Sequence, residues 1–244
     1  SVGDLALAYD AMQGGDPDDP WCAERAPEPV AGRMEAGAAG LRIAVAGGYF
    51  AAGGEPAAYA AVAAASAALG ATRIVDIPEA GHARAAAYLV TASEAAALHL
   101  ERLRTRPGDF DPAVRDRLIA GALLPAAWVQ RAQRFRRRYR ENVLALFEEV
   151  DVILAPATPC RAPRIGQATF VLGGVEMPVR PNIGIYTQPI SFIGLPVAAV
   201  PVWPDDGLPL GVQVIAAPWR EDLALRVARD LERAGVARAP VAAL

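Results

Sequence analysis

The chain has 244 residues, of which 53% are hydrophobic and 21% are charged, and its formal net charge at pH 7 is −3. This length can bury a substantial core, and no apolar stretch reaches the roughly 18 residues that span a bilayer. The negative balance disfavours a general nucleic-acid binder. Composition therefore predicts a soluble globular protein, without a membrane or nucleic-acid partner, that handles small neutral or anionic molecules.

Residue types exclude several kinds of chemistry. All 24 basic residues are arginine, so this chain has no lysine to act as a base or to form a Schiff base. Cys22 and Cys160 form no CxxC pair, and His82 and His99 lie in helical sequence without an HExxH motif. We therefore expect no metal, no cofactor and a reducing, cytoplasmic setting. The start at Ser1, without a signal-peptide pattern, suggests a fragment or a processed piece.

The first 80 residues predict a helix, a strap and a strand-helix-strand unit. Residues 1–40 begin with an amphipathic helix that stops at Gly14 and Gly15, and a proline-rich, acidic surface strap follows. Within residues 41–80, "LRIAVAGGYF" and "TRIVDI" are strands on either side of a helix, and we expect them to be parallel. Glycines near Gly47 do not match GxGxxG, which disfavours dinucleotide binding.

Residues 81–150 predict helices throughout. One apolar stripe recurs every three or four residues: Trp128, Ala132, Phe135, Tyr139, Val143, Leu146 and Val150. The intervening "RFRRRYR" is either an RNA-binding face or, more simply, the solvated side of this helix, formed by Arg136, Arg137, Arg138 and Arg140. Glu94 fits helix packing or capping better than catalysis.

Residues 151–244 predict the centre of the fold. "DVILAPATP" is a buried strand, and a glycine-rich excursion through Gly173 and Gly174 follows it. "PVAAVPV" and "LGVQVIAA" are further strands with a tight connection at Asp206 and Gly207, and "REDLALRVARDLERAG" is a closing helix. Strands that read as continuous apolar runs between helices indicate an α/β sheet covered on both faces.

Four phrases occur together and in order: "SVGDLALAYDAMQGGDPDDP", "DVILAPATP", "TQPISFIGLPVAAVPV" and "GLPLGVQVIAAPWREDLALRVARDLE". In this combination the chain resembles the C-terminal half of an amidase-signature enzyme, from Ser1 to about Glu232. The resemblance implies that residues 1–244 are the C-terminal portion of a single amidase domain, with a mixed β-sheet core covered by helices on both faces.

The resemblance also implies where catalysis comes from. Such amidases use a serine nucleophile, a second serine with a cis peptide bond and a lysine base, in a part that normally precedes this stretch. Here the serines are Ser1, Ser66, Ser93 and Ser191, none of them in a Gly/Ser-rich loop, and lysine is absent. We therefore expect no catalytic residue in this chain, which would supply only the sheet and the substrate pocket.

The resemblance places the stretch that begins at Thr187 along the acyl pocket, as a short helical turn that bends at Gly-Leu-Pro into a central strand. The substrate-binding candidates are Arg117, Arg180, Asn182, Tyr186, Thr187, Gln188 and Ser191. Arg117 would grip a substrate carboxylate, whereas Arg115 would face elsewhere on the helix. The alternatives are that Arg117 is a solvated helix arginine and that Thr187, Gln188 and Ser191 only satisfy backbone groups.

One difference from glutamine-using members of the family narrows the range of expected substrates. Glutamine-using relatives tend to carry an aspartate where this chain has Ile183, which cannot hold a substrate ammonium. The chain thus most resembles the branch that hydrolyses the C–N bond of carboxybiuret or other small acyl-urea and amide compounds, completed by an N-terminal half or a partner subunit. The alternatives are a non-catalytic subunit or truncated fragment, and an arginine-rich RNA-binding module. A chain expressed alone should aggregate or form a homodimer.

Overall fold

The computed structural model describes residues 1–203 and 207–241, which form two compact units. Unit 1 comprises Ser1–Asp76, Leu146–Tyr186 and Leu195–Leu244, and unit 2 comprises Ile77–Ala145 and Thr187–Gly194. The predicted turn at Asp206 lies outside the described residues.

Unit 1 is built around a five-stranded mixed sheet with the order β2-β1-β3-β7-β6. Its strands are β1 (Ile43–Ala46), β2 (Arg73–Val75), β3 (Val152–Pro156), β6 (Val197–Val202) and β7 (Leu210–Ala216). Strand β1 is parallel to β2 and β3, whereas β7 is antiparallel to β3 and β6. This arrangement confirms the predicted α/β class and its mixed sheet. One detail was wrong, because β6 lies at an edge of the described sheet and not at its centre.

The predicted strand-helix-strand unit is confirmed as β1, α2 (Pro56–Ala68) and β2. Pro56 opens α2, where its missing N–H costs nothing because the first turn has no internal acceptor. The other helices of unit 1 are α1 (Val2–Met12), α6 (Val179–Asn182) and α8 (Glu221–Arg233), with short 3-10 turns η1 (Met34–Ala36) and η2 (Gly48–Ala51).

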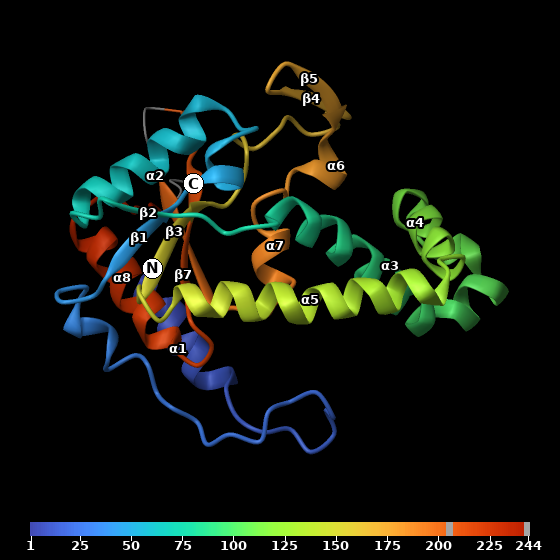
Figure 1. The fold of residues 1–244 in the computed structure, drawn as a ribbon, viewed down its shortest axis with the longest axis horizontal. Coiled ribbons are helices and arrows are strands. Elements are labelled where there is room, and N and C mark those ends of the chain that lie inside the picture. The colour runs from blue at the N-terminus through green and yellow to red at the C-terminus, as the bar shows by residue number, and fades with distance from the viewer. Residues whose placement is uncertain (204–206, 242–244) are drawn as a thin grey trace. The chain divides into compact units, whose positions relative to one another are not determined.

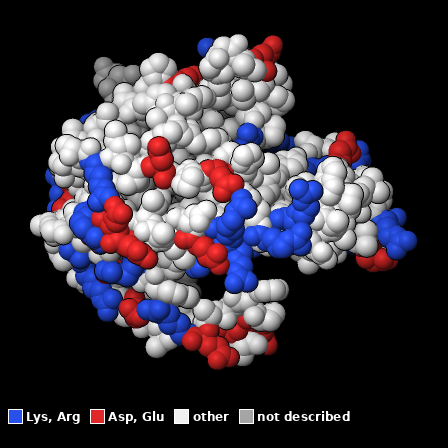
Figure 2. Space-filling model, viewed as in Figure 1, with Lys and Arg blue, Asp and Glu red and all other residues white. Residues whose placement is uncertain are grey.

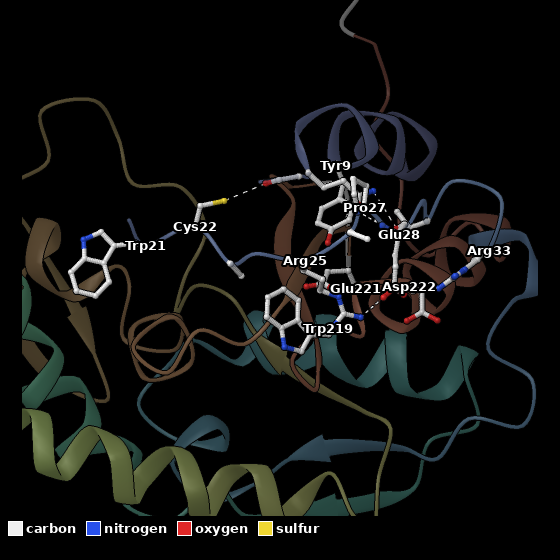
Figure 3. A pocket seen from close by; sticks show the side chains of 15 residues that line it. Tyr9, Trp21, Cys22, Arg25, Pro27, Glu28, Arg33, Trp219, Glu221 and Asp222 are labelled. Carbon is white, nitrogen blue, oxygen red and sulfur yellow. Dashed lines mark hydrogen bonds and ion pairs between the residues drawn. The ribbon is translucent and has the colours of Figure 1, made fainter. Parts of the chain in front are cut away.

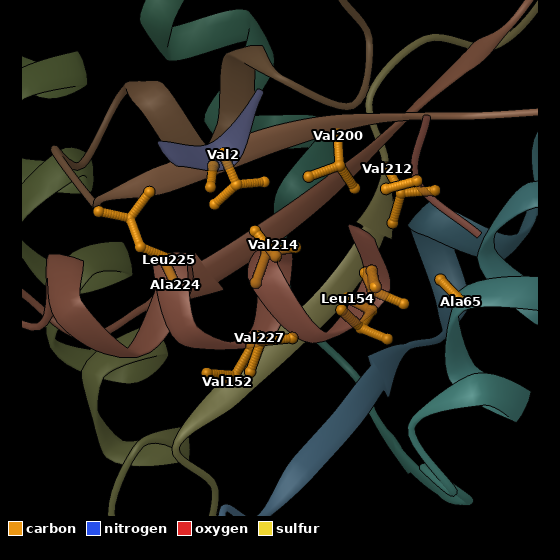
Figure 4. Packing of buried hydrophobic residues seen from close by; sticks show 14 of the residues in the cluster. Val2, Ala65, Val152, Leu154, Val200, Val212, Val214, Ala224, Leu225 and Val227 are labelled. Carbon is orange, nitrogen blue, oxygen red and sulfur yellow. The ribbon is translucent and has the colours of Figure 1, made fainter. Parts of the chain in front are cut away.

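The core of unit 1 lies between the sheet and helices α1, α2 and α8. All five residues of β3 are buried, and Val152 and Leu154 face the same cluster as Val227 of α8 (Figure 4). The neighbouring residues Ile153 and Ala155 point to the other side of the strand and are buried as well. Burial on both faces explains why β3 reads as an unbroken apolar run.

The first helix forms as predicted, but it buries a narrower face than its larger apolar residues suggest. Val2 and Ala6 are buried, whereas Leu5 and Met12 are 47% and 79% exposed. Ser1 and Asp4 form a capping box at its start. The strap that follows appears as the long blue loop in Figure 1, and the Asp10 carboxylate accepts hydrogen bonds from the backbone N–H groups of Val30 and Ala31.

The glycine-rich excursion is a β-hairpin of β4 (Thr169–Leu172) and β5 (Val175–Pro178). Gly173 and Gly174 form its two-residue turn with φ of 57° and 80°. Positive φ at both central positions matches the turn type that follows the right-handed twist of paired strands. The sequence signal was present, since a Gly-Gly pair stands between two β-rich tetrapeptides.

Unit 2 is helical, as predicted. It contains α3 (Ala80–Thr105), α4 (Pro112–Ala122), most of α5 (Ala126–Leu146), the short α7 (Gln188–Ser191) and a 3-10 turn η3 (Pro107–Asp109). Ala132, Tyr139 and Val143 of the predicted stripe are buried, whereas Trp128 is 54% exposed. Helices α3 and α4 meet closely at Gly121, where an added Cβ would lie 2.1 Å from the Ala92 carbonyl oxygen.

Two kinds of feature are absent from the described residues. None of their helices combines the length and the hydropathy that crossing a membrane requires. No group of three or more His, Cys, Asp or Glu side chains in this part of the chain is arranged to hold a metal ion. On the face that Figure 2 shows, arginine and acidic side chains lie beside one another.

Candidate functional site

A cavity of about 320 Å³ within unit 2 brings together three of the predicted site residues. Arg117, Gln188 and Ser191 line it, together with Tyr88, Glu94 and Arg136. These side chains come from four helices, α3, α4, α5 and α7. The cavity therefore concentrates cationic and amide groups in a space that suits a small polar ligand.

Arg117 reaches the cavity because of its place on α4. The Asp111 side chain caps this helix by accepting a hydrogen bond from the Ala113 backbone N–H. The Arg117 guanidinium carbon lies 4.3 Å from the centre of the Tyr88 ring, which covers one face of the cation. Arg115 forms an ion pair with Asp116 and is not among the lining residues, in agreement with the prediction.

Arg136 corrects the interpretation of "RFRRRYR" as a solvated face. Its Nε donates a hydrogen bond of 2.6 Å to the Phe192 carbonyl oxygen, and its guanidinium carbon lies 5.4 Å from the centre of the Phe192 ring. A signal was available in the sequence, because Arg136 stands one helical turn after the buried Ala132. Arg138 is engaged too, since it pairs with Glu79 at 2.8 Å.

The two arginines that line the cavity keep their charge available to a ligand. Neither Arg117 nor Arg136 forms an ion pair with a carboxylate in the described part of the chain. The one acidic lining residue, Glu94, is exposed, and its Oε1 lies 3.5 Å from Gln133 Nε2. Partly covered and uncompensated guanidinium groups favour an anionic ligand, because a carboxylate restores the charge balance that the cavity lacks.

Helix α7 carries the remaining lining residues. Pro189 stands in its first turn, and Gly194, with φ of 69°, ends the segment in a conformation that favours glycine. Gln188 Oε1 accepts a hydrogen bond of 3.0 Å from Arg84 Nε, and Ser191 Oγ donates to the Gln188 backbone carbonyl at 3.3 Å. The short helical turn that the resemblance implied at this stretch is therefore present.

The other candidates lie elsewhere in the described chain. Thr187 belongs to unit 2, and its carbonyl oxygen accepts backbone hydrogen bonds from Ile190 and Ser191. Arg180, Asn182 and Tyr186 belong to unit 1. Arg180 is exposed on α6, and Asn182 Nδ2 donates to the Pro178 carbonyl oxygen at 2.9 Å.

Tyr186 is fully buried in a chain of hydroxyl groups within unit 1. Its hydroxyl donates to the Ala52 carbonyl oxygen at 2.6 Å and lies 2.9 Å from the Tyr59 hydroxyl, which in turn accepts from the Gly54 backbone N–H at 2.5 Å. Tyr186 gives its one hydrogen to Ala52, so Tyr59 must donate to Tyr186. Burial, followed by the hydrogen bond with Tyr59, raises the pKa of Tyr186 well above that of a free tyrosine.

Unit 1 has a further cavity, of about 370 Å³, beside the strap (Figure 3). Arg25 stacks over the Trp219 ring at 4.7 Å and pairs with Glu28, so this cation already has partners. Trp21 is 93% exposed. The cavity includes none of the predicted site residues, which leaves the cavity of unit 2 as the better candidate for the substrate pocket.

Comparison with known proteins shows which family the chain resembles. The chain is 52% identical over 240 residues to AtzE, a 1-carboxybiuret hydrolase subunit of Pseudomonas sp. (strain ADP), covering 98% of this chain and 52% of that protein. It is 31% identical to a glutamyl-tRNA(Gln) amidotransferase subunit of Azotobacter vinelandii (strain DJ / ATCC BAA-1303), covering 96% of this chain and 53% of that protein.

A solved structure shows the same fold. It is an inhibitor-bound form of a vestigial protein complex, described as revealing the evolutionary origins of an s-triazine catabolic enzyme, and it matches with a TM-score of 0.94 and 52% identity. The match covers 98% of this chain and 52% of that chain, so the present chain spans about half the length of these relatives. The amidase family model matches residues 1–225. The chain therefore belongs to the amidase family.

Proposed function

We propose that this chain is the pocket-bearing part of an amidohydrolase that cleaves the C–N bond of a small amide or acyl-urea carrying a carboxylate. The observation that carries the proposal is the cavity of unit 2, which Arg117 and Arg136 line without forming an ion pair to any carboxylate among the residues that the structure describes. Two guanidinium groups beside Gln188 suit the carboxylate of such a substrate. The family and the likeness to a carboxybiuret hydrolase subunit support the same reaction class.

Catalysis requires groups that this chain does not supply. It contains no lysine, and its serines do not lie in a Gly/Ser-rich segment. We propose that the nucleophile and the base come from the half of the enzyme that the relatives possess and this chain does not span, either in one longer polypeptide or in a partner subunit. Acyl transfer to that serine, followed by attack of water, would complete the hydrolysis.

Ile183 supports a substrate without an α-ammonium group. Its side chain is partly buried against an apolar cluster within unit 1 that includes Phe170, Leu172 and Val179. An aliphatic side chain in such surroundings offers no acceptor for an ammonium group, which counts against glutamine as the substrate. Arg180, Asn182, Tyr186 and Thr187 stay predictions as substrate-binding residues.

The cellular location and the partner subunit are further parts of the proposal. Cys22 and Cys160 are both free thiols, which supports the cytoplasmic location that the sequence predicts. The name of the relative AtzE describes it as one subunit, and the matching structure is of a complex, which supports a partner subunit here. Self-association of the chain when it is expressed alone is the alternative outcome that size-exclusion chromatography would detect.

The test uses the chain together with an N-terminal half, supplied as one polypeptide or in trans. We expect ammonia release from 1-carboxybiuret and from malonate monoamide, little from malonamide, and none from glutamine. Glutamine turnover that matches turnover of the carboxylated compounds would overturn the substrate assignment. Failure to cleave any amide in every combination would favour a non-catalytic subunit.

A further inference from the structure

We infer that Arg84 holds Gln188 in one orientation, with the side-chain NH₂ group directed into the cavity of unit 2, and that Gln188 thereby selects ligands that end in acceptor oxygens. The inference rests on the proposed function and deepens it. It assigns Gln188 a specificity-determining role and Arg84, which is not a lining residue, a positioning role.

The orientation follows from hydrogen-bond chemistry. A glutamine amide has one oxygen that accepts and one nitrogen that donates, and the two are hard to tell apart by shape alone. Arginine has only donors, so the Gln188 atom 3.0 Å from Arg84 Nε must be the oxygen. A flipped amide would place an N–H donor of Gln188 against the Nε–H donor of Arg84 and lose the hydrogen bond between them. Arg84 therefore decides the orientation.

The cavity then presents donors to a ligand. Gln188 lines the cavity and Arg84 does not. The Gln188 amide oxygen is therefore hydrogen-bonded to a residue outside the cavity lining, and its NH₂ group is available to donate to a ligand. Arg117 and Arg136 add guanidinium N–H groups from other helices. The Arg136 Nε is already bonded to Phe192, which leaves its two terminal nitrogens to donate.

Such an array of donors distinguishes a ligand that ends in a carboxylate from a ligand of similar shape that ends in a primary amide. A carboxylate offers only acceptor oxygens and also neutralises a guanidinium charge. A primary amide of the same size replaces one oxygen by NH₂, and in either orientation this NH₂ faces the donor of Gln188 or of an arginine and leaves a donor unsatisfied. Sites that bind one hydrogen-bonding pattern reject the reversed pattern because buried polar groups then lack partners.

Gln188→Glu is the decisive variant, because it keeps the shape of the side chain and can still accept from Arg84 with one oxygen. Its other oxygen replaces the NH₂ group with a negative acceptor. We expect malonate monoamide to bind at least ~100-fold more weakly, since a charge-assisted hydrogen bond is lost and a repulsion is added. The thermal midpoint should stay unchanged or rise, because the pair with Arg84 becomes an ion pair.

The matched control is Gln130→Glu. Gln130 is an exposed residue of α5 that lines a different cavity of unit 2, so this variant adds the same charge without touching the site. Arg84→Gln should reduce the preference for malonate monoamide over malonamide about tenfold, because the Gln188 amide is then able to flip. Arg84→Lys should retain most of this preference, because lysine also has only donors. Binding is measured by calorimetry on the full chain.

The outcomes separate this inference from the proposed function. Normal binding by Gln188→Glu, or an equal loss in Gln130→Glu, would overturn the role of Gln188. A shift of the Gln188 side-chain NH₂ resonances on addition of malonate monoamide, lost in Arg84→Gln, would support it even if no amide is hydrolysed. If the Gln188 and Arg84 variants hydrolyse carboxylated amides and keep the preference for malonate monoamide over malonamide, the proposed function stands and this inference is rejected.

Discussion

Replacing Tyr186 by phenylalanine tests whether this residue serves the core or the substrate. The change removes one hydroxyl group and keeps the fully buried ring. It deprives the Ala52 carbonyl of its donor at 2.6 Å and the Tyr59 hydroxyl of its acceptor at 2.9 Å. Ala52 is exposed and can bind water instead, so most of the cost arises at Tyr59.

The expected loss is about 2 kcal/mol of unfolding free energy, because the partly buried Tyr59 hydroxyl loses its acceptor and its hydrogen bond from Gly54 is weakened. For a chain of this size that corresponds to a fall of roughly 4–8 °C in the thermal midpoint. A double-mutant cycle with Tyr59→Phe should give a coupling of about 1 kcal/mol between the two hydroxyls, because each variant alone breaks the same contact.

Urea unfolding measures the free energy, and calorimetry with malonate monoamide measures binding. We expect reduced stability and unchanged affinity for the ligand. If the Tyr186→Phe variant is as stable as the wild type but binds the ligand poorly, the assignment of this hydroxyl to the core is refuted and the prediction of Tyr186 as a substrate-binding residue is supported.

Three further changes test the fold. Asp151→Asn should lower the unfolding free energy at pH 7 by about 1–2 kcal/mol, because Arg42 binds this carboxylate through Nε, Nη2 and its backbone N–H. The hydrogen bond from Arg42 lowers the pKa of Asp151. The difference in unfolding free energy between wild type and variant should therefore be complete above the unfolded pKa of about 4 and disappear as the pH falls through the lower folded pKa. Urea midpoints between pH 7 and pH 2.5 would show this, and a difference that stays constant with pH would contradict it. Gly121→Ala should destabilise unit 2 by more than about 2 kcal/mol, because the new Cβ would lie 2.1 Å from the Ala92 carbonyl oxygen, and an unaltered circular-dichroism melt would contradict that contact. Leu154→Ala should cost about 3 kcal/mol in urea unfolding, because it empties a fully buried position of β3; a cost below about 1 kcal/mol would mean that the core collapses around the gap.

The sequence by itself determined the elements that repeat a burial pattern. The closing helix α8 is one example, since Leu223, Val227 and Leu231 recur every four residues and all three are buried. Strand β3 is another, because five successive apolar residues can be buried together only where both faces of a strand are covered. In both cases the information is local, so the period of the pattern suffices to predict the element.

The tertiary structure alone decided how the candidate pocket is assembled. Arg136 lies beside Phe192 and Arg84 lies beside Gln188, although each pair is far apart in the sequence. A helical pattern says which face of one helix is covered, but not which carbonyl or amide from another segment meets it. The hydrogen bond between Arg84 and Gln188 and the position of Arg117 over Tyr88 are therefore properties of packing among helices, and no stretch of sequence encodes either one alone.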